Sequence, residues 1–248
     1  MKIRYISDIH LEFINPNKIE KYLKRIEPNK DDIYVCAGDI GDPYKYHYDI
    51  FMKYMSKNFK KVFVIAGNHE YYNNDKDINE TDEYLDEYFK QYDNISYLNN
   101  SYEYYEGYCI IGTTLWSKIT NPQYEINDVK RIRNFDYIEY NRLNKKCVKF
   151  LEETVNINTK CIIITHHMPS SSLINEKYRT PNMLPYSQWF YSNMDNFIEK
   201  NKDKILCWIY GHTHMPSEEM INDIQFICNP IGYPNENKDN NYNKSINI

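Results

Sequence analysis

The sequence predicts an α/β domain built on a mixed β-sheet, and two patterns lead to this prediction. The first is a series of apolar, strand-like runs, most of them nearly continuous, as expected of strands that are covered on both faces. These runs lie at residues 2–7, 33–37, 62–66, 108–115, 160–165, 205–210 and 224–228. The second is a helical pattern between several runs in the first third of the chain, which is typical of right-handed parallel units.

Four segments between the strand-like runs carry apolar residues at helical spacing. Residues 18–26 place four apolar side chains on one face, and Pro28 ends this segment because proline cannot continue a helix. The same spacing recurs at residues 50–55, 84–89 and 143–155. We therefore expect helices to cover the sheet.

The later part of the chain predicts a different strand arrangement. From about residue 94 the strand-like runs come closer together, and residues 102–111 form a Tyr-rich candidate hairpin, so part of the sheet should be antiparallel. The polar clusters described below span residues 8 to 214, and a second domain would divide them. We expect one domain at residues 1–234, followed by a polar tail at 235–248 that lacks fixed structure.

The charge balance disfavours a nucleic-acid substrate. The formal net charge of the 248 residues is −5 and the pI is about 5.8, whereas nonspecific binding to a phosphate backbone needs a clustered excess of Lys and Arg. Bound metal ions would add local positive charge, so nucleic acid is not excluded. No apolar stretch approaches the roughly 20 residues of a membrane span, and no membrane partner is expected. Nothing in the sequence sets the oligomeric state.

The cysteines indicate a reducing compartment. Five of the six lie inside apolar strand-like runs and no CxxC pair is present, so we interpret them as small buried thiols and not as disulfides or zinc ligands. The first residues enter a strand-like run directly and show no signal-peptide pattern. These observations predict a cytoplasmic protein.

Five short polar clusters close strand-like runs and offer the oxygen and nitrogen donors that hold divalent metals. They are Ser7-Asp8-Ile9-His10, Gly38-Asp39, Gly67-Asn68-His69-Glu70, Thr165-His166-His167 and Gly211-His212-Thr213-His214. Each cluster alone could be ordinary loop polarity. Six of the chain's seven histidines lie in these clusters, however, and only His47 lies outside them. Accidental placement is a poor explanation, and the series indicates a two-metal site.

Local geometry assigns some of these side chains. Asp8 and His10 are two residues apart at a strand end, and the period of two points both to the same side. His166 and His167 are adjacent and face opposite ways, so we expect one to be a ligand and the other structural, with His166 favoured. His69 is either a further ligand or a proton carrier.

In order, spacing and strand context, the series resembles the calcineurin-like metallophosphoesterases. Three further stretches, at residues 112–116, 165–170 and 228–234, resemble a microbial and viral branch of that family. The resemblance spans nearly the whole chain, and no metal position of the pattern is missing. It implies a two-sheet mixed β-sandwich flanked by helices, which makes four layers.

The resemblance also implies a ligand set and a reaction. One metal would take Asp8, His10 and His214, the second would take Asn68, His166 and His212, and Asp39 would bridge the two. A hydroxide bridging two divalent ions would attack a phosphomonoester or phosphodiester. His69 would be the general acid to the leaving group or a donor to the phosphate.

The metals and the substrate contacts stay open. Oxygen and nitrogen ligands without thiolate suit Mn, Fe, Zn, Co or Ni, and the resemblance favours manganese or an iron-containing pair. Asn68, His69, His167, Arg131 and Arg133 are candidate substrate contacts, because a guanidinium can bind phosphate, although a solvated basic face explains the two arginines equally well.

Weaker alternatives concern neighbouring residues and the reaction class. Glu70 could fix a ligand's hydrogen bonds, whereas packing is favoured over base stacking for Tyr71 and Tyr72. A nuclease of the same family, and a metal-binding scaffold that has lost turnover, are the alternative functions.

Overall fold

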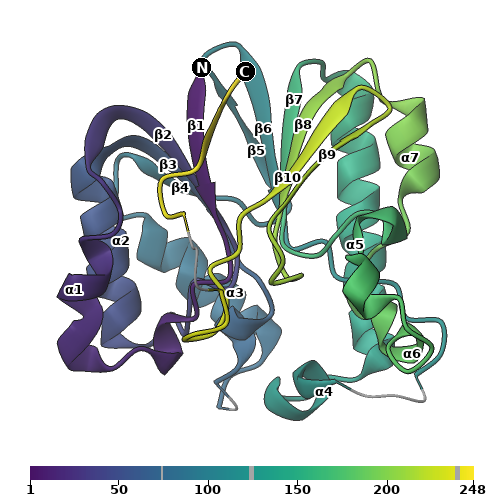
Figure 1. Cartoon of the computed structure of the whole chain (residues 1–248), viewed down its shortest axis with the longest axis horizontal. Coiled ribbons are helices and arrows are strands. Elements are labelled where there is room, and N and C mark those ends of the chain that lie inside the picture. Colours follow the sequence, from purple (N-terminus) through teal and green to yellow (C-terminus); the bar gives the residue numbers. More distant parts are fainter. Residues whose placement is uncertain (74, 123–125, 238–240) are drawn as a thin grey trace.

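The computed structural model describes residues 1–73, 75–122, 126–237 and 241–248. Two mixed β-sheets pack face to face, with helices on their outer sides (Figure 1). The strand order is β11-β1-β2-β3-β4 in the five-stranded sheet and β5-β6-β7-β8-β10-β9 in the six-stranded sheet. The predicted α/β class and the four-layer sandwich implied by the family resemblance are confirmed.

The first sheet contains the parallel units that the first third of the sequence predicts. Its parallel strands are β1 (Lys2–Ile6), β2 (Asn29–Ala37), β3 (Phe59–Ile65) and β4 (Ile95–Tyr97). The connections contain α1 (Ile19–Leu23), α2 (Tyr46–Asn58) and α3 (Ile78–Phe89). Figure 1 shows α1 and α2 on the outer side of this sheet. Crossover helices between parallel strands cover the sheet, and they bring the carboxyl ends of all these strands to the same edge.

The second sheet mixes parallel and antiparallel pairs. Its strands are β5 (Ser101–Tyr105), β6 (Tyr108–Thr113), β7 (Cys161–Thr165), β8 (Ile205–Tyr210), β9 (Ser217–Ile221) and β10 (Ile224–Cys228). β5 and β6 form the expected Tyr-rich hairpin, and its turn residues Glu106 and Gly107 both have positive φ, as a two-residue turn of this hand requires. β6, β7, β8 and β10 run parallel.

Helices α5 (Tyr137–Ile157) and α7 (Asp195–Lys200) lie outside the second sheet (Figure 1), and α4 (Asn127–Arg131) and α6 (Leu184–Ser187) are short. Helix starts follow from local chemistry. Asp77 and Glu80 form a capping box at the start of α3, and the Asp136 carboxylate accepts the first amide hydrogens of α5. 3-10 turns occur at residues Leu11–Phe13, Pro16–Lys18, His69–Tyr71, Ser171–Leu173 and Glu176–Tyr178.

The interior between the two sheets is filled by alternate residues of the central strands. Ile3, Val35 and Ile65 of the first sheet form one buried cluster with Ile162 and Ile209 of the second. Alternate burial follows from the period of two in a strand. A larger cluster fills the space between the sheets and their helices. Strands covered on both faces explain the continuous apolar runs in the sequence.

The C-terminal residues differ from the expectation of an unstructured tail. β11 (Ser245–Asn247) pairs antiparallel with β1, with Ile246 buried opposite Ile3. Met1 and Ile248 also exchange hydrogen bonds, so the two termini lie side by side (Figure 1). The expectation was wrong for residues 245–247 because the free edge of β1 pairs a segment whose composition alone favours disorder. Residues 238–240 of the expected tail lie outside the described residues, and the domain boundary at residue 234 stays a prediction.

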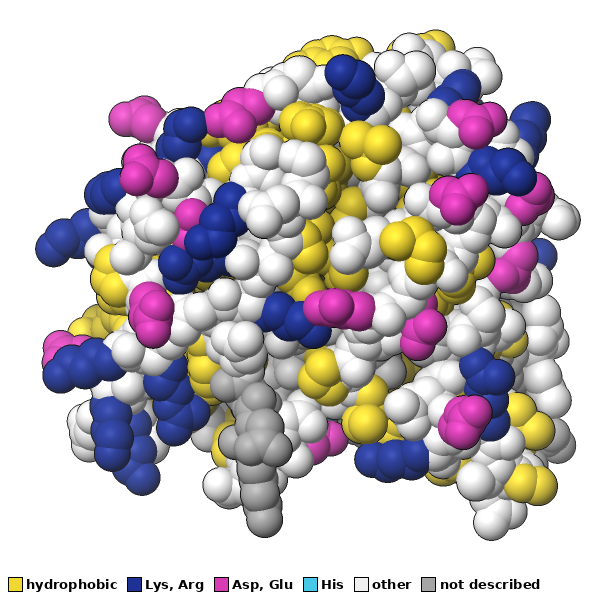
Figure 2. Space-filling view, turned by 45° about the horizontal axis from the view of Figure 1, so that its top comes forward, with side chains coloured by type: hydrophobic (Ala, Val, Ile, Leu, Met, Phe, Trp, Pro, Cys, Tyr) yellow, Lys and Arg dark blue, Asp and Glu magenta, His cyan; other side chains and the backbone are white. Residues whose placement is uncertain are grey.

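The surface carries charges of both signs. On the face shown in Figure 2, acidic and basic side chains lie interspersed. A search of the described residues for a helix with enough length and hydropathy to cross a bilayer found none.

Candidate metal centre

The five polar clusters follow β1, β2, β3, β7 and β8, and each begins where its strand ends. These strands run parallel within their sheets, so their carboxyl ends meet at one edge of each sheet. Because the sheets pack face to face, the two sets of loops come together. Loops from opposite ends of the sequence therefore supply donors to one site.

The backbone of these loops is left-handed at most of the candidate ligands. Five of them have φ between 50° and 66°, namely Asp8, His10, Asp39, His212 and His214. Such values cost about 1 kcal/mol or more for residues other than glycine and concentrate at functional sites. Asp8 and His10 do converge, but the expected period of two is not the reason. The chain leaves the extended conformation at Asp8, and the left-handed turns aim both side chains.

Two glycines permit the close approach of these loops. A Cβ at Gly211 would lie 2.8 Å from the Asp8 carboxylate, and a Cβ at Gly67 would collide with the carboxylate of Asp39. Any larger residue would displace a candidate ligand. The glycine that precedes a polar residue in these clusters is therefore a packing requirement of the site.

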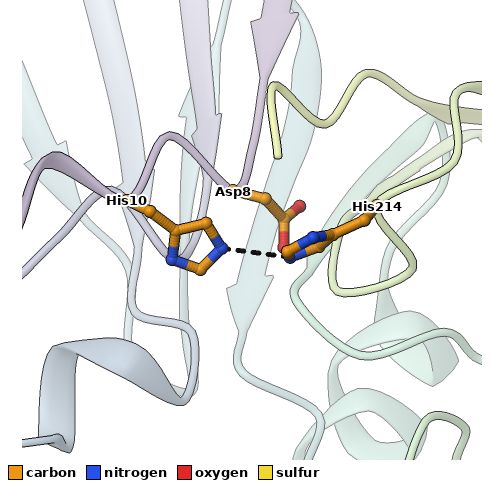
Figure 3. A group of neighbouring side chains, drawn as sticks. All are labelled: Asp8, His10 and His214. Atoms are coloured by element: carbon orange, nitrogen blue, oxygen red, sulfur yellow. Dashed lines mark hydrogen bonds and ion pairs between the residues drawn. The ribbon is translucent and has the colours of Figure 1, made fainter. Parts of the chain in front are cut away.

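Asp8, His10 and His214 form the first donor group (Figure 3), and their ligand atoms lie within 4.8 Å of one another. The two Nε2 atoms of the histidines are 3.0 Å apart. Nδ1 of His10 faces a carboxylate oxygen of Glu12 at 3.3 Å, and Nδ1 of His214 faces Glu236 at 2.7 Å. A neutral ring that donates through Nδ1 keeps a lone pair on Nε2. Two lone pairs and the Asp8 carboxylate then face a common point, which suits a cation.

Asp39, His166 and His212 form the second group, again within 4.8 Å. The ring of His166 places Nδ1 3.0 Å from the carbonyl oxygen of Ala37, which can only accept, so its Nε2 is left with a lone pair. That Nε2 lies 3.0 Å from Oδ1 of Asn68 and 3.3 Å from Oδ1 of Asp39. Nε2 of the buried His212 has no hydrogen-bond partner among the described residues. A cation would satisfy all of these acceptors.

Hydrogen bonds from its nitrogen atom fix the orientation of the Asn68 side-chain amide. Its Nδ2 donates to Oδ1 of Asp128 at 2.8 Å and to the hydroxyl of Tyr72 at 3.1 Å, which turns Oδ1 toward His166. Asp128 is fully buried and also accepts from Tyr72 and Tyr140. Burial raises the pKa of Asp128 more than these donors lower it. Sequence reasoning missed Asp128 because it stands outside every cluster.

Asp39 lies between the two groups. Its Oδ1 is 3.3 Å from Nε2 of His166 and its Oδ2 is 3.9 Å from Nε2 of His10. Burial opposes charge on His166, yet the Asp39 carboxylate raises the pKa of that ring to about 10. The same contact holds the pKa of Asp39 well below its ordinary value, against the effect of burial.

His69 lies beside both groups and makes four contacts. Its amide donates to Oδ1 of Asp39 at 2.8 Å, and its Nδ1 lies 2.8 Å from Oε1 of Glu12. Its ring stacks on Tyr72, and its Nε2 lies 3.3 Å from the hydroxyl of Tyr233. Burial lowers the pKa of His69, but Asp39 and Glu12 together raise it to about 9. Neither Glu12 nor Tyr233 was selected from the sequence, because each lies outside the His-bearing motifs.

Glu70 links the loops after β2 and β3. Its carboxylate accepts from the amides of Asp39 at 3.0 Å, Ile40 at 2.7 Å and Gly67 at 2.7 Å. The expected hydrogen bond to a ligand side chain is therefore replaced by bonds to the ligand-bearing backbone. Burial raises the pKa of Glu70 to about 7.

A cavity adjoins this centre, and three of the candidate substrate contacts do not line it. His167 is buried, with Nδ1 3.3 Å from the carbonyl of Thr114 and Nε2 2.8 Å from the Tyr140 hydroxyl, and burial lowers its pKa to about 3. Both ring nitrogens are used inside the protein, as expected of the structural member of the His166–His167 pair. Arg131 and Arg133 are exposed and are absent from the described lining of the cavity.

Arg133 lies 3.5 Å from the Glu80 carboxylate and donates to a backbone carbonyl, so its guanidinium is engaged at the surface. Asn68 and His69, by contrast, line the cavity together with Asp39, His212 and His214. The structure thus brings all seven candidate ligands together and separates the two arginines from them.

The two packed sheets define an α/β protein. The oxygen and nitrogen donors that lie side by side at their strand ends form its candidate metal centre. Residues 1–216 match the calcineurin-like phosphoesterases, and the chain belongs to this family. It is accordingly a phosphoesterase-type hydrolase with metal-binding groups. Uncharacterized protein L509 of Acanthamoeba polyphaga mimivirus is 30% identical over 268 residues, covering 97% of this chain and 94% of that protein.

Solved structures share the fold at low sequence identity. Phosphopantetheinyl hydrolase of Mycobacterium tuberculosis superposes with a TM-score of 0.77 at 15% identity, covering 99% of this chain and 95% of that one. TT1561 of Thermus thermophilus gives 0.57 at 13% identity, covering 92% and 88%. These similarities support the fold assignment.

Proposed function

We propose that the protein hydrolyses phosphomonoesters or phosphodiesters with two divalent metal ions bound at this centre. One observation carries the proposal. Two groups of lone-pair donors lie side by side, and Asp39 directs one carboxylate oxygen toward each. Asp8, His10 and His214 would hold one ion, Asn68, His166 and His212 the other, and Asp39 would bridge them.

When bound, the two cations would supply positive charge to the phosphoryl oxygens and acidify a water molecule at neutral pH. The chain's own groups orient the centre. Glu12 and Glu236 fix the rings of His10 and His214 through Nδ1, and Asp128 fixes the amide of Asn68. Such outer hydrogen bonds set ligand direction and basicity.

His69 is the proposed general acid. Glu12 holds its Nδ1, which leaves Nε2 directed to the cavity near the Tyr233 hydroxyl. A proton on Nε2 can pass to the oxygen of the leaving alcohol as the P–O bond breaks. The alternative role for the same N–H is a hydrogen bond to the phosphoryl group. The two roles differ in how the activity of a His69 variant depends on the leaving group of the ester.

Manganese is the metal we propose, because the family resemblance favours it and the mixed oxygen and nitrogen donors without thiolate are compatible with it. Iron, zinc, cobalt and nickel fit the same donor set. The six cysteines are all buried free thiols in the structure, which supports our proposal of a cytoplasmic protein.

The test is an activity screen of purified protein loaded with each divalent metal. Aryl phosphomonoesters, aryl phosphodiesters, a phosphopantetheinyl ester and single-stranded DNA form the panel, the third because of the activity named for a structural neighbour. We expect metal-dependent hydrolysis of an ester and a large loss in His69→Asn. Failure across the panel, with tight metal uptake, would favour a silent scaffold. DNA cleavage at moderate salt would favour a nuclease.

A further inference from the structure

A cavity of about 410 Å³ adjoins the metal centre, within the size range of sites for small organic ligands. Asp39, Asn68, His212 and His214 are among the residues that line it. A phosphoryl group held at the centre would therefore extend its ester group into this cavity.

The rest of the lining is largely apolar. Its apolar members come from several loops and from the segment around α6, namely Ile126, Met168, Ile174, Tyr178, Met183 and Phe190. Among the described residues that line the cavity there is no lysine or arginine. Apolar walls favour an apolar ligand, because each CH₂ group removed from water strengthens binding. The lining therefore selects substrates by their chemistry as well as by their size.

Apart from His69 and the candidate ligands His212 and His214, the described lining offers no basic side chain to a charged ester group. Asp128 is fully buried and accepts hydrogen bonds from Asn68, Tyr72 and Tyr140. Glu236 is engaged by Nδ1 of His214. An additional phosphate or carboxylate at the far end of the alcohol would meet no lysine or arginine among the described lining residues, and burial of an unpaired charge is strongly unfavourable.

We propose that the substrate is an ester of a single phosphoryl group with an uncharged, mainly apolar alcohol, and that the cavity binds this alcohol. Polyphosphates and esters whose alcohol carries a negative charge are excluded by the same lining. The inference rests on the proposed function, because the metal centre must hold the phosphoryl group for its ester chain to reach the cavity.

Equilibrium binding of two matched phosphonates tests the proposal without turnover. Butylphosphonate and 4-phosphonobutyrate have the same number of carbons, and only the end of the chain differs between methyl and carboxylate. Calorimetry on manganese-loaded protein should give a dissociation constant for butylphosphonate at least about tenfold lower, since the chain end is buried in an apolar wall. Methylphosphonate, which has three fewer carbons to bury, should bind up to about 50-fold more weakly than butylphosphonate.

A pair of neighbouring variants shows whether the cavity is responsible. Met183 lines the cavity, whereas Leu184 is the next residue, is 56% exposed and lies outside the lining. Met183→Ala should weaken butylphosphonate binding several-fold and leave methylphosphonate unchanged. Leu184→Ala should change neither. Ile174→Ala, in a different part of the wall, should repeat the Met183→Ala result.

The outcomes separate this inference from the proposed function. Equal affinities for the two matched phosphonates, or a preference for the carboxylate, would overturn the inference while metal-dependent ester hydrolysis persisted. Binding of no phosphonate together with hydrolysis of no ester would instead remove the proposed function. Loss of methylphosphonate binding in Met183→Ala would also count against the inference, because it would show that the variant disturbs the centre itself.

Discussion

Oε1 of Glu12 lies 2.8 Å from Nδ1 of His69, although 57 positions separate the two residues in the sequence. Glu12 belongs to the first loop of the first sheet and His69 to the loop after β3. The same carboxylate oxygen is 3.3 Å from Nδ1 of His10. One side chain therefore orients both a candidate metal ligand and the candidate acid.

Glu12→Ala should lower kcat by about 10- to 100-fold, because outer hydrogen-bond partners at metal sites typically contribute this much. The loss should be greater for phenyl phosphate than for 4-nitrophenyl phosphate, since a poorer leaving group needs protonation more. Glu12→Gln keeps an acceptor and should recover part of the activity. Steady-state kinetics with both esters measures the effect. An equal loss for the two leaving groups would contradict a role through His69.

Asp39→Asn should reduce the bound metal from two ions to one or none, because the amide offers a single acceptor oxygen and no charge. Activity should fall more than about 100-fold, beyond the loss typical of an outer partner. Metal analysis by mass spectrometry after desalting measures occupancy. Asp49→Asn, at a surface ion pair with Lys53, is the matched control and should keep both metals. Full occupancy in Asp39→Asn would argue against bridging.

Removal of metal should lower thermal stability. A ligand that binds only the folded state at 100 times its dissociation constant stabilises by about 2.7 kcal/mol, which corresponds to roughly 5–10 °C in Tm for a chain of this size. Differential scanning calorimetry with chelator, and then with excess manganese, measures the shift. In His212→Ala the increase in Tm on adding manganese should be smaller, because this variant lacks a candidate metal ligand. The ligand is the buried Nε2 of His212, which has no hydrogen-bond partner among the described residues. No shift with any divalent metal would contradict a metal centre.

The C-terminal strand should contribute to stability. Ile246 is buried where β11 pairs with β1, so Ile246→Ala should cost about 2 kcal/mol of unfolding free energy. Ile157→Ala is the matched control, because Ile157 is 72% exposed at the end of α5 and should change stability by less than about 0.5 kcal/mol. Urea unfolding of both variants measures the difference. Equal stabilities would mean that the tail adds nothing to the first sheet.

A half-buried carboxyl away from the candidate metal centre, that of Asp82, predicts a dependence of stability on pH. Burial raises the pKa of Asp82 above its ordinary 3.8, although the Tyr71 hydroxyl donates to it at 2.7 Å. The folded state therefore binds this proton more tightly than the unfolded state. The stabilisation is complete below about pH 3.8 and is lost as pH rises through the folded-state pKa.

Asp82→Asn keeps the acceptor for Tyr71 and stays neutral, so in chelator it should raise the free energy of unfolding at pH 7. The gain should shrink as the pH is lowered toward 4. Urea titrations at several pH values measure it, and Asp203→Asn at an exposed position should show no such trend. A gain that is constant with pH would rule out titration of Asp82 as its source.

The composition of individual segments was enough to predict much of the fold. Continuous apolar runs such as residues 62–66 indicated strands covered on both faces, and helical spacing at residues 143–155 indicated the helix that became α5. These signals are local, because period and length depend only on neighbours. β11 was missed for the same reason. Its pairing depends on the free edge of β1, which no local pattern reveals.

The polar clusters at strand ends likewise predicted the candidate ligands from residue type and position. Residues that directly follow parallel strands meet at one edge of the sheet, so oxygen and nitrogen donors at these positions can share a metal ion. The partners that orient those ligands came only from the tertiary structure. Glu12, Asp128 and Glu236 are ordinary acidic residues in the sequence, and what distinguishes them is the donor each one faces.

By itself, the sequence determined the class of fold and the set of candidate metal ligands, since both are encoded in patterns of a few adjacent residues. Only the tertiary structure decided that His167 faces Tyr140 while Arg133 faces Glu80. It also decided that the cavity beside the centre is apolar. The physical reason is that distance, burial and lone-pair direction arise between segments far apart in the chain and exist only once the two sheets have packed.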